Sequence, residues 1–152
     1  MSGEGERTAV LIRWHMKLGW WGLFTFVLLG IVLESLHGFK VGWYVDAMNE
    51  TRRLMWTLAH AHGTLMSLLH LAFALTARTC PRWSGRSQRI ASVCLSAAAL
   101  TLPLGFLLGG VFVHGGDPGL GIVLVPPSGV LLLIALAATA VGAGRGSDPN
   151  HS

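Results

Sequence analysis

The sequence predicts an all-α integral membrane protein, a four-helix bundle with its N-terminus and its C-terminus in the cytoplasm. Of its 152 residues, 52% are hydrophobic and only 12% are charged, whereas about a quarter of the residues in a soluble domain are charged. The apolar residues form long runs without alternation, which is typical of helices that span a bilayer. Basic residues flank these runs, so the formal net charge of +4 reflects membrane topology.

Four apolar runs are long enough to cross the hydrocarbon layer, which is about 30 Å thick and needs about 20 helical residues. They predict helices at residues 18–36, 54–76, 90–113 and 118–141. Together with their connections they form a single domain, residues 1–144. The polar tail at 145–152 is predicted to be disordered, because it has too few apolar residues to pack.

The third and fourth runs contain residues that disturb a regular helix. Pro103 predicts a kink, and Pro126 with Pro127 predicts that the first half of the fourth helix is bent or partly unwound. Gly105 and Gly109 form a GxxxG spacing that lets another helix approach closely. Between the two runs, Asp117 before a proline predicts a helix N-cap.

The distribution of lysine and arginine predicts the orientation. The N-terminus, the second connection and the C-terminus carry three, four and one basic residues, whereas the first and third connections carry three and none. The positive-inside rule therefore places both termini in the cytoplasm. We expect the lipid bilayer, as a bacterial inner membrane, to be the surroundings of the chain. Nucleic acid is not an expected partner, because no basic and aromatic surface motif accompanies the charge.

This orientation brings ionisable side chains from three helices to the outer membrane face, where we predict a histidine cluster with a carboxylate. Its members are Glu34, His37, His60, His62 and His114. Ionisable groups inside a membrane are costly and usually functional. The set predicts a site for copper, zinc or iron. It also predicts heme b, with His60 and either His114 or His37 as axial ligands; no CxxCH motif for covalent heme is present.

The spacing along the second run assigns its histidines to different faces. His60 and His62 lie about 200° apart around a helix, so they face different neighbours. His60, Thr64 and Ser67 share a stripe that we predict to face inward. His70 lies deeper, at the edge of this stripe, where it is expected to bond a backbone carbonyl. His15 is expected at the cytoplasmic edge.

Three functions remain open at this point. The first is a redox or metal-handling membrane protein that uses the outer cluster. The second is a small membrane enzyme or proton-coupled carrier, in a homo-oligomer, with Glu34 and His60 as acid and base. The third is an accessory subunit of a larger membrane complex, with Gly105 and Gly109 in its contact surface.

Three features of the sequence also resemble known families. The stretch HAHGTLMSLLHLAFA, residues 60–74, resembles the histidine-bearing helices of small proteins related to heme–copper oxidase subunit I, which implies heme or copper. The four-helix layout with the turn GGDPGLG is similar to that of small bacterial membrane proteins. The histidine near the start of the second helix is similar to that of the membrane mutases that act on hydroxylaminobenzene.

Overall fold

The described part of the chain is helical almost throughout. The computed structural model describes residues 2–45, 50–80, 82–83 and 85–146. Its elements are α1 (Ser2–Gly38), α2 (Gly42–Val45), α3 (Glu50–Thr79), α4 (Arg86–Val111), the 3-10 helix η2 (Leu120–Leu124) and α5 (Val125–Gly146). The four longest segments are long and apolar enough to cross a membrane, so the predicted all-α membrane fold is confirmed.

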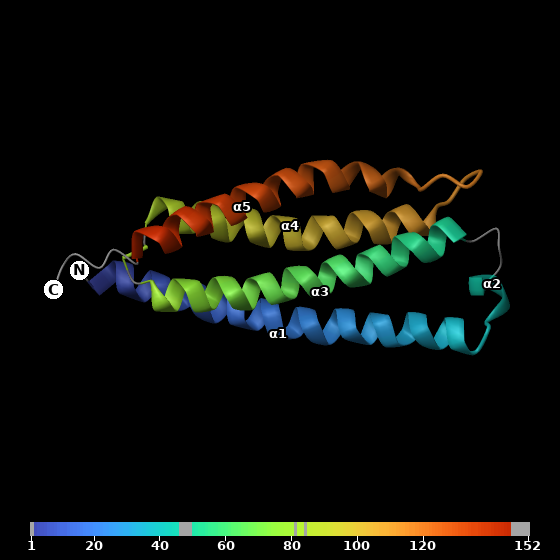
Figure 1. Ribbon diagram of the computed structural model, residues 1–152, viewed down its shortest axis with the longest axis horizontal. Helices are drawn as coiled ribbons and strands as arrows, with labels where there is room; N and C mark the ends of the chain where they lie inside the picture. Colours follow the sequence, from blue (N-terminus) through green and yellow to red (C-terminus); the bar gives the residue numbers. More distant parts are fainter. Residues whose placement is uncertain (1, 46–49, 81, 84, 147–152) are drawn as a thin grey trace.

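The four long helices are neighbours in the order α1, α3, α4, α5 (Figure 1). α3 packs on α1 with one side and on α4 with the other, and α5 packs on α4. The start of α1 and the end of α5 lie at one end of the bundle, which we call the terminal end. The opposite end, with α2 and the turn between α4 and α5, is called the loop end.

The first helix begins much earlier than predicted. It starts at Ser2, whereas the apolar run predicted a start at residue 18. Residues 2–17 contain no proline, and Glu4 in the first turn suits the positive end of the helix dipole. The apolar run identifies only the part of a helix that lipid can surround. The polar part of the same helix, residues 2–17, was therefore not predicted.

The seam between α1 and α3 is closely packed because small residues of one helix accept larger side chains of the other. A Cβ atom added to these glycines would overlap the facing side chain, so the two backbones approach closely. The pairs, from the terminal end to the loop end, are Gly19 with Leu71, Gly22 with Ser67, Gly63 with Phe26, and Gly30 with His60.

The close approach predicted at Gly105 and Gly109 is confirmed. η2 lies against this part of α4, where a Cβ atom on Gly121 would overlap Leu108 and the backbone of both glycines. α4 remains helical through Pro103. The fourth run is partly unwound as predicted, because its first residues form the 3-10 helix η2 before α5 begins.

The turn at the loop end differs from the prediction. The backbones of His114 and Asp117 pair with each other, and both glycines between them have positive φ angles, 59° at Gly115 and 92° at Gly116. The N-cap of the following helix is Gly119, not Asp117. The backbone of Asp117 is held by this tight turn, so it lies too early in the chain to cap η2.

At the other end of the chain, α5 continues into the predicted disordered tail. It ends at Gly146, so residues 145 and 146 are helical. The rest of the predicted tail, residues 147–152, lies outside the described residues.

Candidate functional site

The predicted outer cluster lies at the loop end, but its members do not form one group. His37 is an exposed residue of the last turn of α1, and His114 is an exposed residue of the turn after α4. The described residues contain no group of three or more His, Cys, Asp or Glu side chains that could hold a metal ion. A metal or heme at Glu34, His37, His60, His62 and His114 therefore stays a prediction.

His60 faces α1 and is fixed by a backbone bond. Its Nδ1 lies 2.6 Å from the carbonyl oxygen of Phe26. Because a carbonyl can only accept, Nδ1 carries the proton and Nε2 has a free lone pair when the ring is neutral. His60 and Glu34 line the same groove, of about 420 Å³, which we call the loop-end groove. The pairing of Glu34 with His60 predicted from the sequence is thus possible across one groove.

His62 faces the other way, as its angular separation from His60 predicts. Its Nδ1 donates to the carbonyl oxygen of Leu58 on its own helix, at 2.9 Å. Its ring packs on Phe106 of α4, with the ring centroids 4.8 Å apart. His62 and His60 therefore serve different helix interfaces.

The most buried polar group of the membrane-spanning region joins three helices. Nδ1 of His15 in α1 lies 2.6 Å from Nδ1 of His70 in α3, and Nε2 of His15 lies 2.7 Å from Oγ of Ser92 in α4. His15 is 0% exposed and His70 is 2% exposed. We call these three residues the histidine chain. The bond between His70 and His15 corrects the expectation that His70 bonds a backbone carbonyl. The position of His15 at the cytoplasmic edge stays a prediction.

The ring of Phe73 closes one side of this chain. Its centroid lies 4.3 Å from that of His15, and the two imidazole centroids are 4.7 Å apart. Phe73 belongs to an apolar core cluster that also contains Trp83 and Leu95. Apolar packing of this kind keeps competing hydrogen-bond partners away and holds the two rings in register.

The histidine chain has two equivalent proton arrangements. In the first, Ser92 donates to Nε2 of His15, and Nδ1 of His15 donates to Nδ1 of His70. In the second, Nδ1 of His70 donates to Nδ1 of His15, and Nε2 of His15 donates to Ser92. Both arrangements keep the imidazoles neutral and satisfy the same hydrogen bonds. Passing from one to the other moves one proton along the chain.

The two ends of the histidine chain reach different cavities. Ser92 lines a cavity of about 580 Å³ with Glu6 and Arg7, which we call the terminal cavity. His70 lines a groove of about 270 Å³ between α1, α3 and α4, which we call the central groove. No described residue is hydrogen-bonded to Nε2 of His70. The histidine chain thus connects the terminal end of the molecule with a groove within the membrane-spanning region.

Phe26 is the last residue of α1 that lines the central groove, and the loop-end groove begins at the next residue, Val27. It lines the central groove and its ring lies against Gly63 of α3. Its carbonyl oxygen holds His60, which lines the loop-end groove. Phe26 therefore contacts both grooves, through its ring on one side and through its carbonyl bond to His60 on the other.

A buried tyrosine lies near the loop-end groove. Tyr44 of α2 is 3% exposed, and its ring stacks on Trp56 with the centroids 6.3 Å apart. Burial raises the pKa of the Tyr44 phenol above its ordinary value; the guanidinium of Arg53 lowers this pKa and the carboxylate of Glu34 raises it. Tyr44 is therefore a neutral phenol near the acid of the loop-end groove.

Sequence reasoning missed His15 and Ser92 as members of a site. A signal was available for His15: it lies in helical spacing with Leu11, Gly19, Gly22 and Phe26, the residues on the α3-facing side of α1. Leu11 and His15 lie before residue 18, so the predicted helix did not contain this part of the stripe. Ser92 gave no signal, because serine is common in membrane helices and this one differs from its neighbours only through its partner.

Comparisons with known proteins give no relative from which a function could be transferred. No protein-family model matches the chain, and no curated protein or solved structure matches it. The resemblances noted for the histidine-bearing helix therefore stay predictions.

Proposed function

We propose that this protein performs acid–base chemistry on a small molecule in the central groove. His70 gives a proton to this molecule or takes one from it, and His15 with Ser92 exchanges that proton with the terminal cavity. The observation that carries the proposal is the histidine chain, because it ends in a cavity on each side. Transfer toward the groove moves each proton by one step. A proton passes from solvent to Ser92, another from Ser92 to Nε2 of His15, another from Nδ1 of His15 to Nδ1 of His70, and another from Nε2 of His70 to the substrate.

The lining of the central groove indicates a small and mainly apolar substrate. It combines apolar side chains with a few hydroxyl groups, from Thr25, Ser67 and Ser96. Trp21 and Leu100 at the groove are 69% and 67% exposed in membrane-spanning helices, so the groove opens sideways toward lipid. A volume near 270 Å³ is at the lower end of the range for ligand sites, which favours a molecule of about one ring.

A proton-coupled carrier is the second candidate, and the position of Phe26 favours it. His60 and Glu34 form a second polar half on the far side of this ring. Two half-paths that meet at an apolar barrier suit alternating access from the two membrane faces, provided that the barrier moves. The enzyme proposal needs only the terminal half and no such movement.

The metal or heme role predicted for the loop end has its own test. A visible absorption spectrum and a metal analysis of the protein purified in mild detergent are expected to show a Soret band or stoichiometric copper, zinc or iron if the prediction is right. His60→Ala would then remove the signal. Assembly into a homo-oligomer or a larger complex is a separate prediction, which the mass of the purified particle tests.

Proton permeability of liposomes tests the proposed proton path. We expect liposomes with the native protein to hold an imposed pH gradient, because the Phe26 ring interrupts the polar path. Phe26→Ala removes the ring and is expected to make the liposomes permeable to protons by several-fold over the native protein. A trapped pH-sensitive dye, with a potassium diffusion potential set by valinomycin, reports the flux.

Two variants make this experiment decisive. Phe26→Ala with His70→Leu is expected to restore a tight membrane, because the terminal half of the path is then broken. Phe24→Ala is the matched control, because Phe24 is an exposed residue of the same helix. A leak in Phe26→Ala that persists without His70 would contradict the proposed path through the histidine chain. Liposomes of Phe26→Ala that stay as tight as those of Phe24→Ala would contradict the carrier, which needs both halves of the path.

A further inference from the structure

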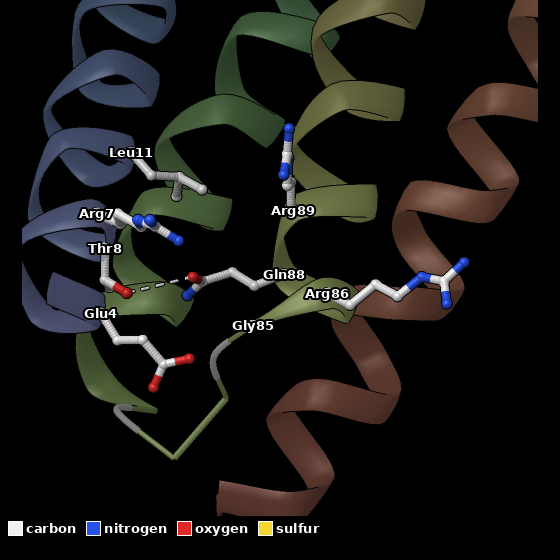
Figure 2. Close-up of a pocket in the computed structure, with 8 residues that line it drawn as sticks. All are labelled: Glu4, Arg7, Thr8, Leu11, Gly85, Arg86, Gln88 and Arg89. Atoms are coloured by element: carbon white, nitrogen blue, oxygen red, sulfur yellow. Dashed lines mark hydrogen bonds between the residues drawn. The ribbon is translucent and has the colours of Figure 1, made fainter. Parts of the chain in front are cut away.

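A second hollow lies at the terminal end, outside the histidine chain. It has a volume of about 650 Å³ and lies between the start of α1 and the start of α4 (Figure 2). We call it the arginine pocket. Its lining residues are Glu4, Arg7, Thr8, Leu11, Gly85, Arg86, Gln88 and Arg89. It shares Arg7 and Leu11 with the terminal cavity but does not include Ser92.

The floor of the arginine pocket is a fixed amide. Gln88 is only 4% exposed, and its Nε2 donates to the carbonyl oxygen of Trp83 at 2.9 Å. Its Oε1 accepts a hydrogen bond from Thr8 of α1 at 3.4 Å. Trp83 is itself buried and packs on Phe73 and Gly142. The pocket therefore lies on a packed junction in which Gln88 and Trp83 join α1, α4 and α5.

The arginine pocket has a net positive charge. It has three guanidinium groups and one carboxylate, and none of the four makes a hydrogen bond or an ion pair with another described residue. In Figure 2 the side chains of Glu4 and Arg7 point from α1 toward α4, Arg89 stands along α4, and Arg86 extends toward α5. Arg7 and Arg89 are therefore the two cations that flank the hollow.

The start of α4 adds to this positive field. Gly85 is its N-cap and provides no side-chain hydrogen bond. The first N–H groups of a helix have no partner within the helix and carry the positive end of its dipole. Together with two guanidinium groups, which bind phosphate oxygens in pairs, they make the hollow suited to a phosphate.

The level of the arginine pocket identifies the source of such a phosphate. Arg86 and Arg89 directly precede the apolar run that begins at Ile90, so the pocket lies where the lipid headgroups begin. Basic pockets between transmembrane helices at this level bind anionic headgroups. Arg13 and Arg78 also supply positive charge at this end without lining the pocket. The positive-inside rule therefore does not by itself require arginines to gather around one hollow.

We infer that the arginine pocket binds a phosphate ester through Arg7 and Arg89, and its level favours the headgroup of an anionic phospholipid over a soluble phosphate. The inference does not depend on the proposed proton path. The arginine pocket and the terminal cavity share Arg7 and Leu11, but neither residue belongs to the histidine chain, and Arg89 and Gln88 line neither the terminal cavity nor the central groove. Failure of either proposal therefore leaves the other intact.

Binding of short-chain lipids to the detergent-purified full chain tests this inference. The probes are dioctanoyl phosphatidylglycerol, sn-glycerol 3-phosphate, inorganic phosphate and phosphate-free dioctanoylglycerol, and thermophoresis measures their dissociation constants. We expect phosphatidylglycerol to bind and dioctanoylglycerol not to bind. Equal binding of sn-glycerol 3-phosphate would assign the site to soluble phosphate esters, and binding by the lipid alone would assign it to headgroups. Absence of binding by all three phosphates would overturn the inference.

Charge variants of opposite sign locate the binding site. Arg7→Gln and Arg89→Gln are each expected to weaken phosphatidylglycerol binding roughly ten-fold, which corresponds to the loss of one charged hydrogen bond. Glu4→Gln is expected to tighten it, because a carboxylate in the pocket repels the phosphate. Arg78→Gln is the matched control and should leave it unchanged. Equal losses in Arg78→Gln and Arg89→Gln would show that only the general charge of this end attracts the lipid, which contradicts the pocket.

Discussion

His70 and His60 lie on the same helix and both face α1, but their partners give them different chemistry. His70 is 2% exposed and bonds the side chain of His15, whereas His60 is half-buried and bonds the backbone carbonyl of Phe26. An imidazole partner can donate or accept, so the proton between His15 and His70 can sit on either ring. A carbonyl only accepts, so the proton of His60 stays on Nδ1. His70 is therefore suited to relay a proton, and His60 is suited to act as a fixed base.

Removal of one imidazole is expected to give the largest difference in stability between the two sites. His70→Leu leaves Nδ1 of His15 buried without a partner, and we expect it to lower the free energy of unfolding by about 1–2 kcal/mol. His60→Leu should cost less, because it frees only a helix carbonyl that already accepts a bond within its helix. Unfolding in mixed micelles with increasing dodecyl sulfate measures both.

The double variant sharpens this result. His15→Leu combined with His70→Leu removes both partners, so much of the loss should be recovered, because replacing both sides of a buried hydrogen bond is close to neutral. A double-mutant cycle gives the coupling energy of the pair. Additive losses from the two single variants would show that the imidazoles do not interact and would remove the contrast with His60.

Chemical modification tests the difference in access. We expect diethylpyrocarbonate to modify His60 faster than His70 and His15, because His60 lines the loop-end groove while the other two are buried. His37 and His114 are exposed and serve as the fast references. Mass spectrometry of peptides separates the sites. Modification of His15 at the rate of His114 would mean that the histidine chain is open to solvent.

Titration of the tyrosine probes the loop end and has the smallest expected effect. The chain has one tyrosine, so absorbance near 295 nm reports Tyr44 alone. Burial raises the pKa of Tyr44 above its ordinary value of 10.0 and the carboxylate of Glu34 raises it further, so Glu34→Gln should shift the midpoint downward. Since the folded pKa lies above the unfolded pKa, the contribution of Tyr44 to stability is complete below about pH 10 and is lost as the pH rises through the folded pKa. An unchanged midpoint in Glu34→Gln would place Glu34 away from Tyr44.

The four long apolar helices were predictable because a bilayer imposes a length and a composition on each membrane-spanning helix. The close approach at Gly105 and Gly109 and the opposite facing of His60 and His62 were predictable from helical spacing. The helix start at Ser2 was not predictable from hydropathy, because lipid contact and helix formation are different conditions. With α1 predicted to begin at residue 18, His15 lay outside the predicted helix, and only the histidines near the outer membrane face were expected to form a cluster.

The histidine chain depends on facts that one sequence does not contain. His15 and His70 lie 55 positions apart, and their contact requires the rotation and the register of two helices to agree to within a fraction of an ångström. Glycines at the α1–α3 seam set this register. Glycine occurs 20 times in the chain, so composition alone does not identify the ones that matter.

The bond between Nδ1 of His15 and Nδ1 of His70 can be measured directly by nuclear magnetic resonance of the protein labelled with ¹⁵N-histidine. We expect a scalar coupling between two Nδ1 nuclei, and its loss in His70→Leu, because a proton shared across 2.6 Å connects them. The Nδ1 of His60 is expected to couple to no other histidine. If all histidine Nδ1 nuclei are uncoupled in the folded native protein, the two imidazoles share no proton, and the proposed proton path through the bundle is wrong.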